Sequence, residues 1–237
     1  MRNKGYAPIF GEFGEGETIL EFRWDLIWSS LPMLLQGAKL TVQLTSIAVF
    51  FGIILGTLTG IARLSKGPFR ILAAIYIDVI RGTPLLVQTF IVFYGLPSII
   101  HRPIPAYVAA ILSLSINSGA YVGEIVRSGI QSIDKGQWEA ASSLGLNNYQ
   151  TMRYIILPQA FRRILPPLGN EFIALLKDSS LVSVIALEEL VRKGQIIIGR
   201  TFRPFEIWTA VAIIFFVMTF TVSRLVDYLE RRMTPHA

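Results

Sequence analysis

Charged side chains interrupt stretches of this sequence that are otherwise apolar. Asp78 and Arg81 are three residues apart, as are Glu124 and Arg127, so each pair would lie on one face of a helix. An ionisable group inside a membrane span costs about 2.5–3.5 kcal/mol on insertion scales, and such groups usually face a cavity or a partner. Each pair is therefore either an internal ion pair that stabilises a helix bundle or part of the lining of a polar path.

Residues 168–190 carry another group of polar side chains in an apolar stretch. Asn170 and Lys177 are seven residues apart and share one helix face, while Glu171 and Asp178 share the adjacent face. Carboxylates and cations gathered at moderate depth would suit a zwitterion with a polar side chain. Internal ion pairing is again the structural alternative.

A proline at position 84 interrupts a further apolar stretch, residues 71–98. Proline lacks the backbone N–H that a helix needs, and transporters often bind their substrate where a spanning helix is broken in this way. The polar side chains near the break either bind a substrate or are satisfied by helix packing. The predicted binding residues are Thr83, Gln88, Asn117, Tyr121, Glu124, Asn170, Glu171, Lys177 and Asp178.

The composition is typical of a membrane protein. Of 237 residues, 52% are hydrophobic and only 16% are charged, whereas roughly a quarter are charged in a typical soluble domain. A membrane span takes about 20 mainly apolar residues, so the length allows several spans but no separate soluble enzyme domain. We predict an all-α polytopic fold with five transmembrane helices, at residues 40–62, 71–98, 104–123, 168–190 and 206–226.

The segment before the first span mixes aromatic and charged side chains. Residues 17–36 therefore predict an amphipathic helix that lies on the membrane interface rather than a sixth span. We divide the chain into an extracytoplasmic and interfacial segment, residues 1–36, a transmembrane domain, residues 37–230, and a cytoplasmic tail, residues 231–237.

Basic residues indicate the direction of insertion. Arg63, Lys66 and Arg70 follow the first span, and a larger basic group lies between the third and fourth spans, so both connections should be cytoplasmic. The N-terminus would then be outside and the C-terminus inside. Basic residues at 192–203 oppose this orientation, although acidic residues accompany them. Because Lys and Arg flank the hydrophobic stretches and orient them in the membrane, the net charge of +6 does not indicate nucleic-acid binding.

Small residues recur at every fourth position in two of the spans. Gly52, Gly56 and Gly60 line one face of the first span, and Gly119 and Gly123 line one face of the third. Such rows allow helix backbones to approach closely. We expect ordinary helix packing at these faces, some of it between subunits.

The connection between the third and fourth spans, about residues 128–165, is too polar for the membrane interior. An Ala- and Leu-rich piece favours a short helix. Gly145 can end that helix in a left-handed turn, Asn147 can cap a second helix, and Pro158 should redirect the chain toward the next span. The predicted shape is a cytoplasmic helical hairpin, which on shape alone could be a simple connector.

The residue pattern of this hairpin resembles the EAA loop of ATP-binding-cassette (ABC) importer permeases. Residues 81–88 and 119–137 further resemble the branch of that family that takes up polar amino acids, the histidine-, arginine- and glutamine-type permeases. The resemblance extends from about residue 37 to residue 230. The matching loop positions are Glu139, Ala140, Ala141, Gly145, Ile155, Leu157 and Pro158.

The resemblance implies a transport subunit that is not itself an enzyme. The loop would act as a coupling helix that docks in a cytoplasmic ABC ATPase dimer. Glu139 would make polar contacts there, Ala140 and Ala141 would fit where larger side chains clash, and Gly145 would permit the turn. The chain has no Gly-x-x-x-x-Gly-Lys-Ser/Thr phosphate loop. ATP and Mg²⁺ would therefore bind to the partner, and this chain would bind no cofactor.

The resemblance also implies further partners and a location. A second permease, identical or related, would complete the path, and an extracytoplasmic amino-acid-binding protein would deliver the substrate. The location would be the plasma (inner) membrane of a prokaryote, in contact with lipid. The residues leave open whether the substrate is a basic or a neutral polar amino acid.

Two other classes of protein fit parts of the sequence. A secondary transporter would use Asp78, Glu124 and Asp178 as ion or proton sites, but it leaves the EAA pattern unexplained. A membrane enzyme lacks the necessary groups, because His101 and His236 are the only histidines, neither lies among clustered carboxylates, and there is no cysteine. We predict no catalytic residue and no metal site.

Overall fold

A computed structural model describes residues 22–233 of the protein, and every regular element in this range is a helix. The predicted all-α class is therefore confirmed. The elements are α1 (Trp24–Leu64), α2 (Pro68–Arg81), α3 (Leu85–Phe90), the π-helical turn η1 (Ile91–Gly95), α4 (Leu96–Ile100), α5 (Ala106–Gln131), α6 (Lys135–Ser143), α7 (Asn148–Gln150), the π-helical turn η2 (Thr151–Ile156), α8 (Leu157–Asp178), the 3₁₀ turn η3 (Ser179–Ile185), α9 (Leu190–Thr201) and α10 (Pro204–Met233).

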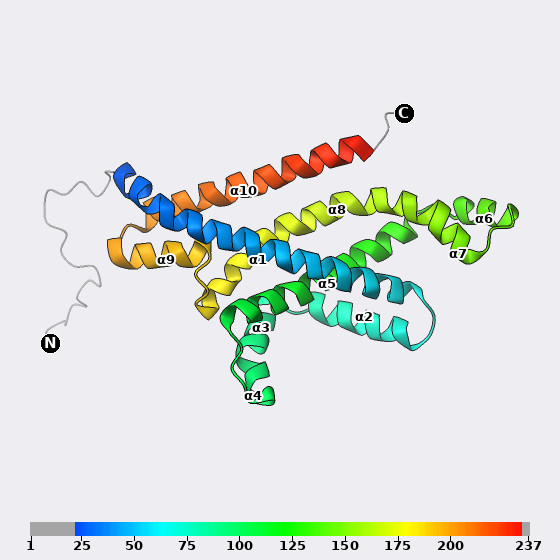
Figure 1. The fold of residues 1–237 in the computed structure, drawn as a ribbon, viewed down its shortest axis with the longest axis horizontal. Helices are drawn as coiled ribbons and strands as arrows, with labels where there is room; N and C mark the ends of the chain where they lie inside the picture. Colours follow the sequence, from blue (N-terminus) through cyan, green and yellow to red (C-terminus); the bar gives the residue numbers. More distant parts are fainter. Residues whose placement is uncertain (1–21, 234–237) are drawn as a thin grey trace, which may run out of the picture.

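The bundle is elongated, and its two ends carry different elements. Figure 1 shows α1, α8 and α10 running roughly along the long axis, and α1 also packs against α5. The short helices α6 and α7 form a hairpin at one end, and α9 lies toward the other. The segment of α3, η1 and α4 projects from the side of the bundle.

Helix α1 contradicts the prediction of a separate interfacial helix before the first span. It runs without a break for 41 residues, across the boundary predicted between residues 36 and 37, with Pro32 inside it. Of the three acidic residues in the predicted amphipathic segment, Glu17 and Glu21 lie outside the described residues, and Asp25 lies in the first turn of α1. Residues 26–38 carry no charge, so nothing in them opposes continuation of the helix. At 1.5 Å per residue, α1 is about 60 Å long, roughly twice the hydrocarbon thickness.

The predicted break at Pro84 is confirmed. Helix α2 and the segment from α3 to α4 meet at an angle of 104°, with Pro84 as the residue before α3. Pro84 cannot donate a backbone hydrogen bond, and its ring disfavours helical geometry at the preceding residue. The predicted second span is therefore two helices at a sharp bend.

The number of spans stays a prediction. Among the described residues, three helices are long and apolar enough to cross a membrane, namely α1, α5 and α10, and the bent pair could form a fourth. Helix α8 has 22 residues, about 33 Å, but it carries more polar and charged groups. The fourth predicted span, residues 168–190, is α-helical only as far as Asp178, where α8 ends and the 3₁₀ turn η3 follows.

The segment after η3, predicted as an outer connection, contains the helix α9. Glu189 begins this helix by accepting hydrogen bonds from the backbone N–H groups of Val191 and Arg192, at 2.9 and 2.8 Å. Lys193 pairs with Glu188 at 2.5 Å. The basic residues that opposed the predicted orientation are thus partly compensated by acidic neighbours.

Close packing of α1 on α5 forms the centre of the fold, as the glycine rows predict. A Cβ atom added to Gly56 would lie 2.5 Å from Cβ of Val122 and 2.7 Å from the carbonyl oxygen of Gly119. One added to Gly60 would lie 2.7 Å from the carbonyl oxygen of Gly123. The two backbones can approach this closely only because these positions lack side chains. This contact fixes α5, which carries several of the predicted binding residues.

Candidate functional site

Three of the predicted binding residues meet at the Pro84 break. The side-chain amide nitrogen of Gln88 donates to the carbonyl oxygens of Ile80, at 2.8 Å, and Thr83, at 3.0 Å, and it also lies 3.0 Å from Oγ1 of Thr83. The amide oxygen of Gln88 accepts from Asn117 at 3.0 Å. Gln88 and Asn117 are both buried. These side chains satisfy backbone groups that the broken helix leaves free, so they stabilise the bend itself.

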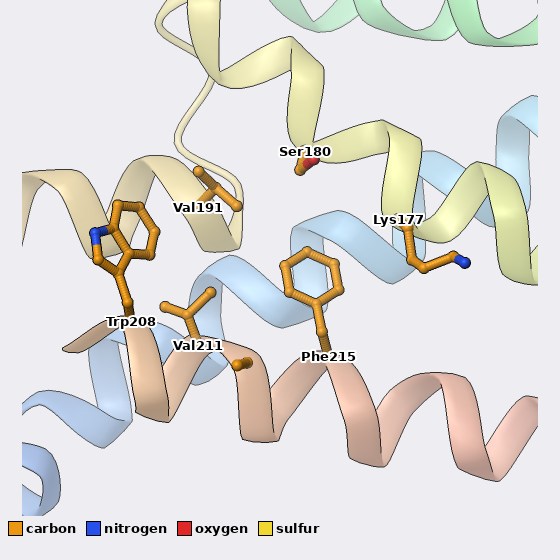
Figure 2. Close-up of a pocket in the computed structure, with 7 residues that line it drawn as sticks. Lys177, Ser180, Val191, Trp208, Val211 and Phe215 are labelled. Carbon is orange, nitrogen blue, oxygen red and sulfur yellow. The ribbon is translucent and has the colours of Figure 1, made fainter. Parts of the chain in front are cut away.

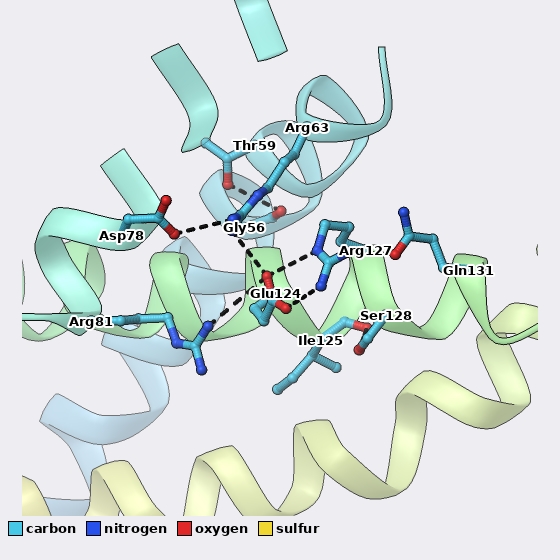
Figure 3. Close-up of polar contacts among 10 residues, drawn as sticks. All are labelled: Gly56, Thr59, Arg63, Asp78, Arg81, Glu124, Ile125, Arg127, Ser128 and Gln131. Carbon is cyan, nitrogen blue, oxygen red and sulfur yellow. Dashed lines mark hydrogen bonds and ion pairs between the residues drawn. The ribbon is translucent and has the colours of Figure 1, made fainter. Parts of the chain in front are cut away.

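A charged cluster connects α1, α2 and α5 next to this bend, as shown in Figure 3. The carboxylate of Glu124 accepts hydrogen bonds from Arg127 and, at 3.0 Å, from Arg63. Arg63 also donates to Asp78 at 3.1 Å, and Arg81 lies 3.9 Å from Glu124. The predicted pair of Glu124 with Arg127 is therefore present.

The predicted pair of Asp78 with Arg81 does not form, and each side chain instead contacts a residue of another helix. Asp78 pairs with Arg63 rather than with Arg81, its neighbour three residues away. Arg63 was predicted only to mark the orientation of the chain, and its place in the cluster was missed. The one available signal was that Arg63 lies at the end of the first span and is followed by a short turn that leads into the helix of Asp78.

The polar face of α8 divides into two. Glu171 lies next to Ser118 of α5 and close enough to Asp178 and Arg81 for their charges to interact, so this face of α8 is turned toward α5 and the charged cluster. Tyr121 belongs to the same region, since Arg81 lies over its ring, 5.3 Å from the centroid. The structure therefore brings Tyr121, Glu124, Glu171 and Asp178 into one neighbourhood.

Lys177 lies elsewhere, in an open groove of about 320 Å³ between the end of α8, α9 and α10. Figure 2 shows Trp208 and Phe215 of α10 across this groove from Lys177 and Ser180. Asn170, two turns earlier, is exposed on the same face of α8. Lys177 and Asn170 thus lie on the α10 side of α8, although Lys177 remains close enough to its neighbour Asp178 for their charges to interact.

The predicted hairpin is present at one end of the bundle. Helix α6 ends before Gly145, whose φ of +75° is a left-handed conformation that favours glycine. Asn147 begins the next helix with a reciprocal capping box, in which it exchanges hydrogen bonds of 2.9 and 3.0 Å with Gln150. Pro158 does not redirect the chain, contrary to prediction. It is the second residue of α8, and α7, the π-helical turn η2 and α8 follow one another without a break, so the chain continues through it in the same direction.

The EAA residues differ in exposure. Glu139, Ala140 and Gly145 are exposed, whereas Ala141 is buried within the hairpin itself. A larger side chain at Ala141 would collide with the hairpin before it reached any partner. Nearby, Leu144 is 81% exposed.

Apolar helices, a charged cluster within them and a polar hairpin at one end together define a polytopic membrane protein. The chain belongs to the family of binding-protein-dependent transport system inner membrane components, which it matches over residues 48–235. It is therefore a transport subunit of an ABC importer, not an enzyme, and the ATPase is a separate subunit.

Individual relatives cover almost the whole chain. The glutamine transport system permease protein GlnP of Escherichia coli K12 is 44% identical over 216 residues, which are 90% of this chain and 99% of that protein. The L-cystine transport system permease protein TcyB of Bacillus subtilis 168 is 42% identical over 213 residues, covering 89% and 91%.

A solved structure agrees with these relatives. The crystal structure of an amino acid ABC transporter with histidines matches with a TM-score of 0.86 and 44% identity, over 90% of this chain and 100% of that one. The comparisons confirm the family that the EAA loop predicts.

Proposed function

We propose that this chain imports polar amino acids, and that a cytoplasmic ATPase dimer supplies the energy. The observation that carries this proposal is the 44% identity to a glutamine permease over almost its full length. The charged residues near the bend support it, because Arg81 and Glu171 present both signs of charge that a zwitterion requires. Basic and neutral polar amino acids both satisfy this requirement.

The substrate path passes the region where α2, α5 and α8 face one another. Tyr121, Glu124, Glu171 and Asp178 lie beside it. Thr83, Gln88 and Asn117 support it by fixing the bend. We leave Asn170 and Lys177 out of this path, because they lie on the face of α8 next to α10.

The α6–α7 hairpin is the coupling element in this proposal. Glu139 and Ala140 contact the ATPase directly, while Ala141 and Gly145 maintain the shape that presents them. ATP and Mg²⁺ bind to the ATPase, and this chain holds no cofactor. A second permease and an extracytoplasmic amino-acid-binding protein complete the importer. The N-terminus lies outside and the C-terminus in the cytoplasm.

Gly145 provides the sharpest test of the coupling role. Gly145→Val places a β-branched residue at positive φ, at a cost of roughly 1–2 kcal/mol, in a position where no atom lies within 4 Å of the new Cβ. We expect association with the ATPase, measured by co-purification, to weaken roughly 5–30-fold. Gly145→Asn should keep association near the wild-type level, because asparagine tolerates this conformation.

Gly67→Val is the matched control, since Gly67 has a φ of +88° and equally open surroundings, but lies in the turn between α1 and α2. It introduces at least as much local strain outside the hairpin, because the ψ of −157° at Gly67 lies in a region essentially confined to glycine. Equal loss of association in both valine variants would contradict the coupling role of the hairpin.

A further inference from the structure

Arg81 is the least engaged of the three arginines around Glu124. Arg63 and Arg127 both donate hydrogen bonds to the carboxylate at 3.0 Å, whereas the nearest nitrogen of Arg81 is 3.9 Å away, beyond hydrogen-bond range. Its side chain is also the most exposed, at 40% against 22% for Arg63 and 26% for Arg127. Arg81 therefore keeps N–H donors free that the other two arginines have used.

Arg81 is nevertheless held in position. Its guanidinium lies over the ring of Tyr121 at 5.3 Å, within the range of a cation–π contact. It is the last residue of α2, directly before the bend at Pro84 that Gln88 stabilises. Figure 3 shows its remaining nitrogens directed away from Glu124. A planar cation that is fixed on one side and free on the other is prepared to bind a carboxylate.

The charge on α8 complements Arg81. Glu171 is close enough to Arg81 for their charges to interact. Among residues 22–233, no lysine or arginine nitrogen lies within 4.0 Å of the carboxylate of Glu171 or Asp178. One region of the bundle thus holds a cation with free donors on α2 and carboxylates without an ion-pair partner on α8.

We propose that Arg81 binds the α-carboxylate of the transported amino acid, with Glu124 as the positioning residue that keeps the guanidinium in place. Glu171 receives the α-ammonium group from the opposite side. This inference rests on the proposed transport of amino acids. It assigns Glu124 an indirect role, because its carboxylate is already bonded to Arg63 and Arg127.

The test compares an amino acid with its own α-amide, which keeps the side chain and the ammonium group but loses the carboxylate charge. Binding is measured by equilibrium dialysis on the permease–ATPase complex without the binding protein, so that the specificity of that protein does not contribute. The ligands are glutamine, arginine and histidine with their α-amides, and the pair whose free acid binds most tightly is used. Wild type should prefer the acid at least tenfold.

Arg81→Gln should weaken binding of the acid by roughly 10–150-fold, the range for a hydrogen bond to a charged group, and should leave amide binding within about twofold. Arg81→Lys keeps the charge without the planar fork and should lose several-fold for the acid alone. Arg70→Gln, an exposed arginine of the same helix, makes the same change in net charge and should keep the wild-type preference.

The inference is wrong if Arg81→Gln keeps the preference for the acid, if acid and amide weaken equally, or if wild type has no preference. Where Arg81→Gln does not assemble, unchanged acid binding in Arg81→Lys is the contradicting result. Failure of the proposed function is a separate observation, namely that the wild-type importer takes up no amino acid with ATP.

Discussion

The contact between α1 and α5 gives the most quantitative prediction. Gly56 and Gly199 are both helical glycines, so replacing either by alanine brings the same gain in helix propensity, about 1 kcal/mol. Their surroundings differ, however. The new Cβ at Gly56 would lie 2.5 Å from Cβ of Val122 and 2.7 Å from the carbonyl oxygen of Gly119, whereas the one at Gly199 meets no atom within 4 Å.

The magnitude follows from this difference. Neither Cβ of Val122 nor the backbone oxygen of Gly119 is the mobile end of a side chain, so the helices must move apart. Forcing an extra carbon into a packed interface costs about 1–3 kcal/mol. Gly56→Ala should therefore be less stable than Gly199→Ala by about 1–3 kcal/mol. For a chain of this size, that difference corresponds to roughly 2–12 °C in Tm.

Thermal unfolding of both purified variants in the same detergent, followed by tryptophan fluorescence, measures the difference. Gly199→Ala should unfold at or above the wild-type temperature and Gly56→Ala below it. The same shift in both variants would refute the close approach of α1 to α5, and with it the placement of Glu124 against Arg63.

Two further variants test the polar contacts. Gln88→Leu removes the side-chain donor to the carbonyl oxygen of Thr83 and the acceptor of buried Asn117, so the free energy of unfolding should fall by about 1–3 kcal/mol; unchanged unfolding would contradict the role of Gln88 at the bend. Glu124→Gln removes the charge that opposes three arginines and should lower the free energy of unfolding by about 1.5–3 kcal/mol, whereas Asp227→Asn, in an exposed pair of 3.9 Å, should change it by less than about 1 kcal/mol. Equal effects in these two acidic variants would argue against the cluster.

Local backbone rules predict much of this fold correctly. Pro84 breaks a helix and Gly145 permits a left-handed turn because each effect depends on the residue itself and its immediate neighbours. The capping role of Asn147 is local in the same sense. The prediction of a separate helix before the first span was wrong because its charges lie before α1 or, as Asp25, in its first turn, where they do not interrupt the helix.

The candidate site was less predictable, because its contacts join residues far apart in the chain. Arg63 and Glu124 are 61 positions apart, and spacing along one helix cannot reveal such a pair. The i, i+3 rule assigned Asp78 to Arg81, but the packing of α1 on α2 and α5 offers Arg63 instead. Helical spacing separated the two faces of α8 correctly but could not show that α10 lies next to Lys177.

ATP-dependent uptake in proteoliposomes tests the central claim most directly. The permease, its ATPase and the binding protein are reconstituted, and uptake of labelled glutamine, histidine and arginine is followed with ATP inside or with a Na⁺ or proton gradient alone. We predict uptake of at least one of these amino acids that depends on internal ATP and is indifferent to the gradients. Uptake driven by an ion gradient without the ATPase would contradict this account and favour a secondary transporter that uses Asp78, Glu124 and Asp178 as ion sites.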